Sequence, residues 1–370
     1  MKVLHVFKTY YPDTQGGTEQ FIHQLATATS QMGVLNTVFT VSSNPGGLVS
    51  VKGLDVFQAP KTAEIFHMPL SIKGLFDFRK VAREYDLIHF HHPWPFADLL
   101  YLLFHRNKPA ITTYHLDLIR SPIILFLYSA IQRLFFRRLQ AIVVTSKAYA
   151  ESSQQLLPYK NKVKVIPIGI DETDYPKPGN DLKFKWKERL GDNFILFIGA
   201  FRYYKGLTDL IHACVNSPCK LVLLGGGPLS QEIQQLVSDL GLQSKVIMLG
   251  VIDDLNKMAI LSLAKCLVLP SNSRAEAFGI SLLEGMMMSK PLISTELSTG
   301  TSWVNQHGIT GLVVAPKRPD LLGNAMEWMI SNPESAEEMG RQGRLRFQSK
   351  FDVKYMAEGY FNLYMNILRR

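Results

Sequence analysis

Two glutamates eight positions apart give the clearest chemical signal in this sequence. Glu276 and Glu284 flank Gly279 in the segment 271–284. The apolar residues before this segment predict a short buried strand, and the apolar run that begins at Ile280 predicts a helix. Glu276 would then lie on the connecting loop and Glu284 about one turn into the helix. In that arrangement one carboxylate can face a sugar while the other accepts hydrogen bonds from ribose hydroxyls.

The junction between this loop and this helix would also present backbone donors. The N–H groups of Phe278, Gly279 and Ile280 would be unpaired at the positive end of the helix, which suits a phosphate group. The alternative is a pair of solvated glutamates on one helix, because eight residues bring side chains roughly back to one face. The preceding strand, the glycine and the matching segments elsewhere in the chain favour a nucleotide-sugar site.

A basic pair follows a second predicted strand. Arg202 and Lys205 come shortly after the apolar segment Phe194–Ile198. Cations at the carboxyl end of a strand can neutralise a leaving diphosphate without a metal ion. A solvated pair of surface charges is the alternative, and the position after a strand favours the diphosphate role.

Two glycine turns also follow predicted strands. Gly16 and Gly17 precede a predicted helix at 18–32, where glycine lets the backbone approach a diphosphate, although the same pair could serve chain reversal alone. Gly225–Gly227 superficially resembles a dinucleotide fingerprint, but Ser230 occupies the third glycine position. A nicotinamide cofactor is therefore disfavoured, and a turn lining a nucleotide base pocket remains open.

Histidines gather near two further strand ends. His115 lies just past the predicted strand Ala110–Thr113, where it could hydrogen-bond the transferred sugar or the acceptor, although a lone histidine is more often structural. Asp117 could orient its loop. The cluster His89–Trp94 lacks the cysteine or carboxylate set that would favour zinc. We expect this cluster to form an acceptor-side loop, with His89 lying within the strand as the alternative.

The order of segments predicts the fold class. Apolar strand-like runs alternate with helical segments, which is typical of a parallel α/β sheet. The 370 residues, 46% of them apolar, are too many for one ordinary core and fit two Rossmann-like domains. Residues 175–181 have linker composition, so the domains are expected at 1–175 and 182–350.

Charge and cysteine content limit the binding partners and the cellular compartment that we expect. The net charge is +9, and residues 1–170 hold 18 Lys and Arg against 10 Asp and Glu. Such a basic domain suits an anionic lipid, a nucleic acid or a phosphorylated substrate, with simple solubility as the alternative. Three cysteines without metal or disulfide spacing favour a reducing cytosol, and no signal peptide is evident.

The segment Ile119–Arg138 is strongly apolar and ends in arginines. It is too short and too charged to span a membrane comfortably. It could lie at an anionic membrane surface with Arg133, Arg137 and Arg138 at the headgroups, or it could pack as a buried helix on the sheet. The sequence does not decide between these alternatives.

These segments resemble, in their order and over nearly the whole chain, the retaining nucleotide-sugar glycosyltransferases of family four. The resemblance implies the GT-B fold, with two facing Rossmann-like domains, the nucleotide sugar in the interdomain cleft, and a last helix at about 355–370 that packs back on the first domain. It also implies that the departing phosphate accepts the proton of the acceptor hydroxyl. The implied catalytic residues are His115 and Glu276, and the implied donor-binding residues are Gly16, Gly17, Arg202, Lys205, Phe278, Gly279, Ile280 and Glu284. Within this set Glu276 would contact the donor sugar, Glu284 the ribose, and the basic pair the diphosphate.

The segments 7–12 and 296–308 resemble those of bacterial mannosyl- and rhamnosyltransferases that build O-antigen polysaccharide. That resemblance implies GDP-mannose or GDP-D-rhamnose as donor, a lipid-linked glycan as acceptor, no metal cofactor and no nucleic-acid partner. It places the protein in the cytoplasm, peripheral to the inner membrane. A UDP-sugar donor, a sugar-nucleotide epimerase of the same shape and a non-catalytic sugar-nucleotide-binding module remain alternatives. A glycosidase is disfavoured because a neutral glycan offers the basic pair no phosphate.

Overall fold

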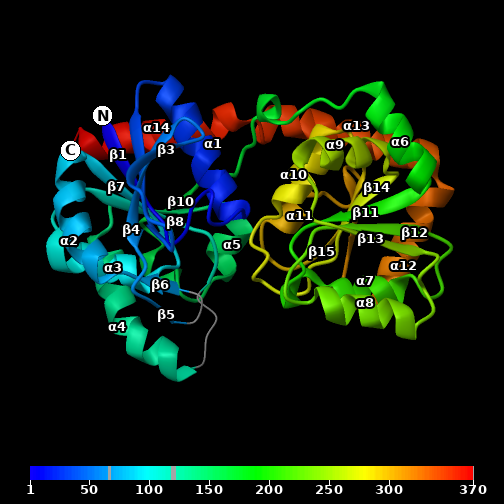
Figure 1. The fold of residues 1–370 in the computed structure, drawn as a ribbon, viewed down its shortest axis with the longest axis horizontal. Coiled ribbons are helices and arrows are strands. Elements are labelled where there is room, and N and C mark those ends of the chain that lie inside the picture. The colour runs from blue at the N-terminus through cyan, green and yellow to red at the C-terminus, as the bar shows by residue number, and fades with distance from the viewer. Residues whose placement is uncertain (66–67, 118–121, 370) are drawn as a thin grey trace. The chain divides into compact units, whose positions relative to one another are not determined.

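The computed structural model describes residues 1–65, 68–117 and 122–369, with the backbone alone for 122–127 (Figure 1). It divides the chain into two compact units. Unit 1 consists of Met1–Ile170 together with Val353–Arg370, and unit 2 of Asp171–Asp352. Both units contain a parallel sheet with helices, so the predicted α/β class is confirmed.

Unit 1 is built on an eight-stranded sheet in the order β10-β9-β8-β7-β1-β2-β4-β3, and β5 and β6 form a separate antiparallel pair. Only β3 runs antiparallel to its neighbour among these eight strands. The strands are β1 (Lys2–Val6), β2 (Leu35–Ser42), β3 (Gly47–Val51), β4 (Leu54–Pro60), β5 (Ala63–Ile65), β6 (Met68–Leu70), β7 (Leu87–His92), β8 (Ala110–Tyr114), β9 (Ala141–Val144) and β10 (Val163–Val165). The helices are α1 (Gly17–Gln31), α2 (Ile72–Val81), α3 (Pro95–Phe104), α4 (Pro122–Arg138), α5 (Lys147–Ser152) and α14 (Val353–Leu368).

The strand order places two predicted site segments at one edge of this sheet. After β1 the chain continues to β2 on one side, whereas β7 pairs with β1 on the other side. The strand order therefore reverses between β1 and β7. Open α/β sheets bind ligands at such a position, beyond the carboxyl ends of their strands. Gly16 follows β1 and His115 follows β8, so both lie on loops at that carboxyl edge.

Helix α14 brings the end of the chain back to unit 1, where it packs against α1 (Figure 1). Its residues Tyr360 and Tyr364 are fully buried. Their hydroxyls reach Thr113 Oγ1 and His89 Nδ1, each at 2.7 Å. The helix therefore completes the polar core of unit 1 as well as its apolar core.

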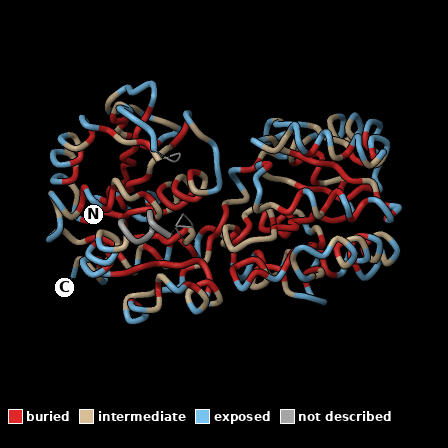
Figure 2. Tube along the Cα trace, turned by 90° about the horizontal axis from the view of Figure 1, so that it is seen from below, coloured by how far each residue is buried: buried red, intermediate tan, exposed pale blue. Residues whose placement is uncertain are grey.

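Unit 2 contains a fully parallel six-stranded sheet in the order β13-β12-β11-β14-β15-β16. Its strands are β11 (Phe194–Ile198), β12 (Lys220–Leu224), β13 (Val246–Gly250), β14 (Cys266–Leu269), β15 (Leu292–Thr295) and β16 (Gly311–Val314). Its helices are α6 (Asn180–Leu190), α7 (Leu207–Ala213), α8 (Ser230–Asp239), α9 (Asp254–Leu263), α10 (Ile280–Met287), α11 (Thr301–Val304), α12 (Pro319–Ser331) and α13 (Pro333–Lys350). Buried stretches run along the strands, while exposed stretches lie on the outer helices and turns, because helices cover both faces of a parallel sheet (Figure 2).

The segment Ile119–Arg138 is described only in part, because residues 118–121 lie outside the described ranges. In the last turns of α4, Phe135 and Phe136 are fully buried, whereas Arg133, Arg137 and Arg138 are exposed. This half of the helix therefore packs on unit 1 through its aromatics and presents its arginines to solvent. No helix in the described part of the chain is long and apolar enough to cross a membrane.

Candidate functional site

The principal candidate site lies at the carboxyl edge of the unit 2 sheet, where strand order reverses between β11 and β14. Lys205 follows β11 and Glu276 follows β14. Lys205 Nζ lies 2.5 Å from Glu276 Oε2, and the Ser271 hydroxyl donates to the same oxygen at 2.9 Å. Thr299 Oγ1 donates to the main-chain carbonyl of Glu276 at 2.8 Å, which fixes the loop. A cation and a carboxylate thus meet where a ligand of this fold would bind.

The electrostatics of this pair favour the charged forms. Burial alone would lower the pKa of the Lys205 ammonium, but the adjacent Glu276 carboxylate offsets burial and raises the pKa above its ordinary value. Arg202 is exposed, and its guanidinium forms no hydrogen bond or ion pair with the described residues. Two cations with different surroundings therefore stand on one loop, one held by a carboxylate and one open to solvent.

The loop between β14 and α10 presents backbone donors to this edge. Gly279 is the residue before α10 and has φ of 88°, and a Cβ there would lie 2.7 Å from Leu269 Cδ2. Glycine is therefore required for both conformation and space. Within the described chain, no group accepts a hydrogen bond from the backbone N–H of Phe278, Gly279 or Ile280. These three donors at a helix N-terminus can bind an anion.

Glu284 lies in the second turn of α10 and is buried. Lys257 of α9 lies 2.9 Å from Glu284 Oε1 and 2.8 Å from Asp254 Oδ1. Burial lowers the pKa of the Lys257 ammonium, while Glu284 and Asp254 together more than offset that effect, so the net pKa is raised. The carboxylate predicted to bind ribose is thus paired with a buried lysine.

The turn Gly225–Gly227 supports the loop that carries the basic pair. A Cβ at Gly225 would lie 1.9 Å from the carbonyl oxygen of Gly199. The N–H of Phe201 donates to the carbonyl of Gly226 at 2.9 Å. The glycines therefore allow two strand-end loops to pack backbone against backbone, and this packing positions Arg202.

In unit 1, Gly16 and Gly17 mark the start of α1, as the sequence predicts. Glu19 in the first turn accepts hydrogen bonds from Thr9 Oγ1 at 2.9 Å and from Thr14 Oγ1 at 2.6 Å. Both threonines lie on the loop after β1, so the buried Glu19 carboxylate ties that loop to the helix. The glycine turn is thereby held in a defined conformation.

His115 is buried beside other histidines of unit 1. Its Nε2 lies 3.1 Å from His91 Nδ1, and His91 Nε2 lies 3.1 Å from His5 Nδ1. Burial lowers the pKa of His115 to about 3 and that of His5 to about 4. Asp117 accepts hydrogen bonds from Tyr114 and from Ser153, so it anchors the loop that carries His115.

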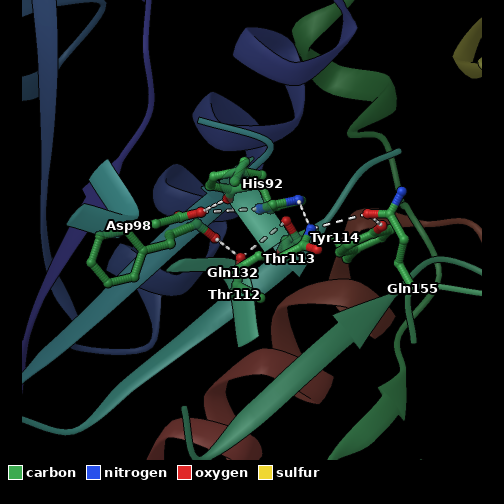
Figure 3. A network of polar contacts seen from close by, with 9 residues as sticks. His92, Asp98, Thr112, Thr113, Tyr114, Gln132 and Gln155 are labelled. Atoms are coloured by element: carbon green, nitrogen blue, oxygen red, sulfur yellow. Dashed lines mark hydrogen bonds and ion pairs between the residues drawn. The ribbon is translucent and has the colours of Figure 1, made fainter. Parts of the chain in front are cut away.

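The prediction that His89–Trp94 forms a loop is wrong for its first four residues. His89, His91 and His92 are buried within β7, because this strand is covered on both faces. His92 points toward Asp98 of α3, and their Nδ1 and Oδ2 atoms lie 3.7 Å apart (Figure 3). Burial raises the pKa of Asp98 to about 8, although the hydroxyl of Tyr128 donates to its carboxyl group, and burial lowers the pKa of His92 to about 3.

The nitrogen atoms of His5, His89 and His91 come close enough together to suggest a metal site. Each nitrogen, however, already has a hydrogen-bond partner. His89 bonds Tyr364 OH and Thr113 Oγ1, while His5 and His91 bond each other and one further group each. The chemistry of this cluster is therefore that of a hydrogen-bonded network.

Sequence reasoning missed three groups at these sites. The sequence assigns no role to Lys257 and Ser271, which contact the two glutamates. Asn36, which bonds His5, was also missed. A histidine inside the apolar run Val3–Phe7 was a usable signal for the buried network, because such a residue needs polar partners. Lys257 left no such signal, since a lysine on a helix is ordinary.

Two family models match the chain in succession. "Glycosyltransferase Family 4" matches residues 15–174, and "Glycosyl transferases group 1" matches residues 180–346. D-rhamnosyltransferase WbpZ of Pseudomonas aeruginosa is 42% identical over 352 residues, covering 95% of this chain and 92% of the relative. O-antigen chain mannosyltransferase C of Escherichia coli is 39% identical over 369 residues, covering 100% of this chain and 99% of the relative.

Solved structures show the same fold. Sucrose-phosphate synthase from Thermosynechococcus elongatus matches with a TM-score of 0.82 at 20% identity, over 100% of this chain and 99% of that one. HepE of Anabaena, in complex with UDP and glucose, matches with a TM-score of 0.81 at 18% identity, over 99% and 100% of the two chains. The fold shared with these structures and the two family models define a GT-B glycosyltransferase. This chain belongs to the glycosyltransferases of family four.

Proposed function

We propose that this protein is a retaining hexosyltransferase that moves mannose from GDP-mannose, or D-rhamnose from GDP-D-rhamnose, to a lipid-linked glycan during O-antigen synthesis. The identities of 42% and 39% to a D-rhamnosyltransferase and an O-antigen mannosyltransferase, over nearly the whole chain, support this choice of sugar and pathway. The observation that carries the donor site is the Lys205–Glu276 pair at the edge where the unit 2 sheet changes direction.

In the proposed site each group has one task. Lys205 and Arg202 neutralise the diphosphate, and the N–H groups of Phe278, Gly279 and Ile280 add hydrogen bonds to its oxygens. When the donor binds, the Lys205 ammonium is shared between the phosphate and Glu276. The Glu276 carboxylate can then accept a hydrogen bond from the sugar. Glu284 accepts hydrogen bonds from the ribose hydroxyls, with Lys257 holding its carboxylate in place. These cations supply the charge that a metal ion would otherwise supply.

The transfer step needs no strong protein base. The acceptor oxygen bonds to the anomeric carbon on the face from which the diphosphate leaves, the bond between that carbon and the phosphate oxygen breaks, and the acceptor proton passes to the departing phosphate. Because burial lowers the pKa of His115 to about 3, a neutral imidazole there is a weak base. This supports a hydrogen-bonding role for His115 and leaves the proton to the phosphate.

A lipid-linked acceptor would require contact with an anionic membrane surface. The exposed Arg133, Arg137 and Arg138 at the end of α4 support such a contact, as does the excess of basic residues in 1–170. In this proposal the enzyme works in the cytoplasm at the inner membrane.

A donor panel read by mass spectrometry tests the proposal. GDP-mannose, GDP-D-rhamnose and UDP-glucose are each incubated with the protein and with lipid-linked glycan from a strain that lacks the enzyme. Release of GDP together with a product one hexose heavier is expected. Faster consumption of the UDP-sugar would overturn the donor assignment, and conversion of the sugar without release of nucleoside diphosphate would indicate an epimerase.

A further inference from the structure

A chain of hydrogen bonds crosses the core of unit 1 from Asn36 to His115. His5 Nε2 lies 3.1 Å from Asn36 Oδ1, and His5 Nδ1 lies 3.1 Å from His91 Nε2. His91 Nδ1 in turn lies 3.1 Å from His115 Nε2. Asn36, His5 and His91 lie on the adjacent strands β2, β1 and β7, and all four side chains are buried.

The chemistry of its surroundings fixes the orientation of the Asn36 amide. Asn36 Nδ2 lies 2.8 Å from the main-chain carbonyl oxygen of Ala26 and 3.0 Å from Thr29 Oγ1. A carbonyl oxygen can only accept a hydrogen bond, so the amide nitrogen must face Ala26. Asn36 therefore presents its oxygen, an obligate acceptor, to His5.

This acceptor sets the proton position on each of the three imidazoles in the hydrogen-bond series. Burial keeps His5, His91 and His115 neutral at pH 7, so each ring carries one N–H and one lone pair. His5 must donate from Nε2 to Asn36, which leaves its Nδ1 as an acceptor. His91 then donates from Nε2 to His5 and accepts at Nδ1. His115 consequently donates from Nε2 and keeps a lone pair on Nδ1.

The free nitrogen of His115 faces outward from this chain. His115 Nδ1 makes no hydrogen bond with any residue in the described ranges. It is also absent from the described side-chain atoms that are both fully buried and without a partner, so this nitrogen keeps some exposed surface. His115 retains 8% exposure at the carboxyl edge of the unit 1 sheet. A lone pair is therefore accessible at the point where the loop after β8 begins.

We propose that Asn36, His5 and His91 are positioning residues that fix His115 as the Nε2–H tautomer, so that its Nδ1 accepts a hydrogen bond from a hydroxyl of a glycan substrate. This inference rests on the proposed function, because it requires a sugar hydroxyl at His115. The same tautomer excludes a diphosphate oxygen as the partner of Nδ1, since both would be acceptors. The hydroxyl belongs either to the transferred sugar or to the acceptor.

His89 provides a matched control for this chain. Its ring centroid lies 4.4 Å from that of His91, and it is equally buried. Its nitrogens, however, bond Tyr364 and Thr113, outside the chain from Asn36 to His115. Replacing His89 removes a buried imidazole of the same stack but breaks no link of the chain.

The first test reads the tautomer directly. Protein labelled with ¹⁵N on histidine is examined by long-range ¹H–¹⁵N NMR without substrate, and His115→Gln assigns the ring. We expect a protonated Nε2 and an unprotonated Nδ1 for His115 in the wild type. His5→Phe should mix the two tautomers of His115, and His89→Phe should not. A protonated Nδ1 in the wild type overturns the inference even if both variants fail to fold. An unchanged His115 in a folded His5→Phe protein also overturns it.

The second test links the tautomer to turnover. His5→Phe should lower kcat/KM about tenfold more than His89→Phe, which corresponds to one misdirected hydrogen bond. A fall in donor hydrolysis without acceptor assigns the hydroxyl to the transferred sugar, and a rise in acceptor KM alone assigns it to the acceptor. Equal losses in the two variants would reject the positioning role. If the wild type consumes no sugar nucleotide, the proposed function fails while the NMR result still decides the tautomer.

Discussion

Lys205 and Glu276, 71 residues apart in the chain, form an ion pair of 2.5 Å at the carboxyl edge of the unit 2 sheet. Both side chains are largely buried, with 13% and 10% of their surfaces exposed. Removing one partner would leave a poorly solvated charge, which is costly. The same two residues are proposed to bind the two ends of the bond that breaks, so binding and folding stability are linked at this position.

Replacing the two cations of the β11 loop should separate catalysis from stability. Arg202→Ala and Lys205→Ala should each lower kcat strongly, because a charge-assisted hydrogen bond to phosphate is worth roughly 1.5–3 kcal/mol. Only Lys205→Ala should also lower the Tm, since it strands Glu276, whereas Arg202 is exposed. Steady-state kinetics and thermal melts measure both effects. Arg318→Ala, which removes an exposed ion pair with Asp320, is the control and should change neither.

Replacing Glu276 and replacing Glu284 should change different kinetic constants. Glu276→Gln should chiefly lower kcat, because its carboxylate is proposed to meet the reacting sugar. Glu284→Gln should chiefly weaken binding of the donor and of free GDP, measured by calorimetry. Glu338→Gln, which breaks an exposed pair with Arg341, serves as the control. Near-wild-type kinetics for both site variants would show that neither glutamate binds the donor.

Activity should survive EDTA, because Arg202, Lys205 and the helix N-terminus are proposed to carry the diphosphate charge. The measurement is GDP release before and after chelation and after addition of Mg²⁺ or Mn²⁺. Loss of turnover that a divalent ion restores would contradict the assignment of these side chains.

Stability should be greatest near pH 6.5. Burial lowers the pKa of His5 to about 4 and those of His92 and His115 to about 3, so below 6.5 the unfolded chain binds protons that the folded chain does not. Each such group lowers the free energy of unfolding by about 1.4 kcal/mol per pH unit as the pH falls toward its folded pKa. Asp98 acts in the opposite direction, because burial raises its pKa to about 8 and the folded state loses stability as the pH rises to that value.

Urea midpoints at pH 5, 6.5 and 8 measure both limbs of this profile. Asp98→Asn should abolish the decline between pH 6.5 and 8 and make the decline below pH 6.5 steeper, because the protonated carboxyl group opposes the histidines there. A midpoint that stays constant between pH 5 and 6.5 would show that the histidines are not held neutral by burial.

The exposed arginines at the end of α4 should promote membrane binding. Replacing Arg133, Arg137 and Arg138 with glutamine should reduce sedimentation with vesicles containing anionic lipid, since each charge near such a surface contributes on the order of 1 kcal/mol. Salt should weaken the binding of the wild type. The Tm should not change, because Phe135 and Phe136 rather than the arginines anchor the helix.

A matched triple variant on unit 2 controls for net charge. Lys185, Lys187 and Arg189 are exposed on α6, and their replacement with glutamine removes the same number of positive charges. This variant should bind vesicles as the wild type does. Absence of vesicle binding by the wild type at any salt concentration would remove the membrane assignment and leave the donor site untouched.

The sequence by itself determined the class of fold and the positions of the site loops. Apolar runs such as Phe194–Ile198 predicted strands, and the alternation with helices predicted two parallel sheets, because burial imposes a local periodicity that can be read from neighbouring residues. The loop position of Glu276 and the helical position of Glu284 followed from the same local pattern. Strands β2 to β6, strand β16 and the extension of β7 through His92 were missed.

The tertiary structure alone decided which side chains meet. Lys205 reaches Glu276, and Lys257 reaches Glu284 from another helix, because the order of parallel strands brings distant loops and helices together. The hydrogen bonds from His5 to His91 and from His91 to His115 depend on strand registers that no local pattern encodes. Periodicity is a property of neighbours in the chain, whereas partner choice is a property of the crossover connections that set strand order and register.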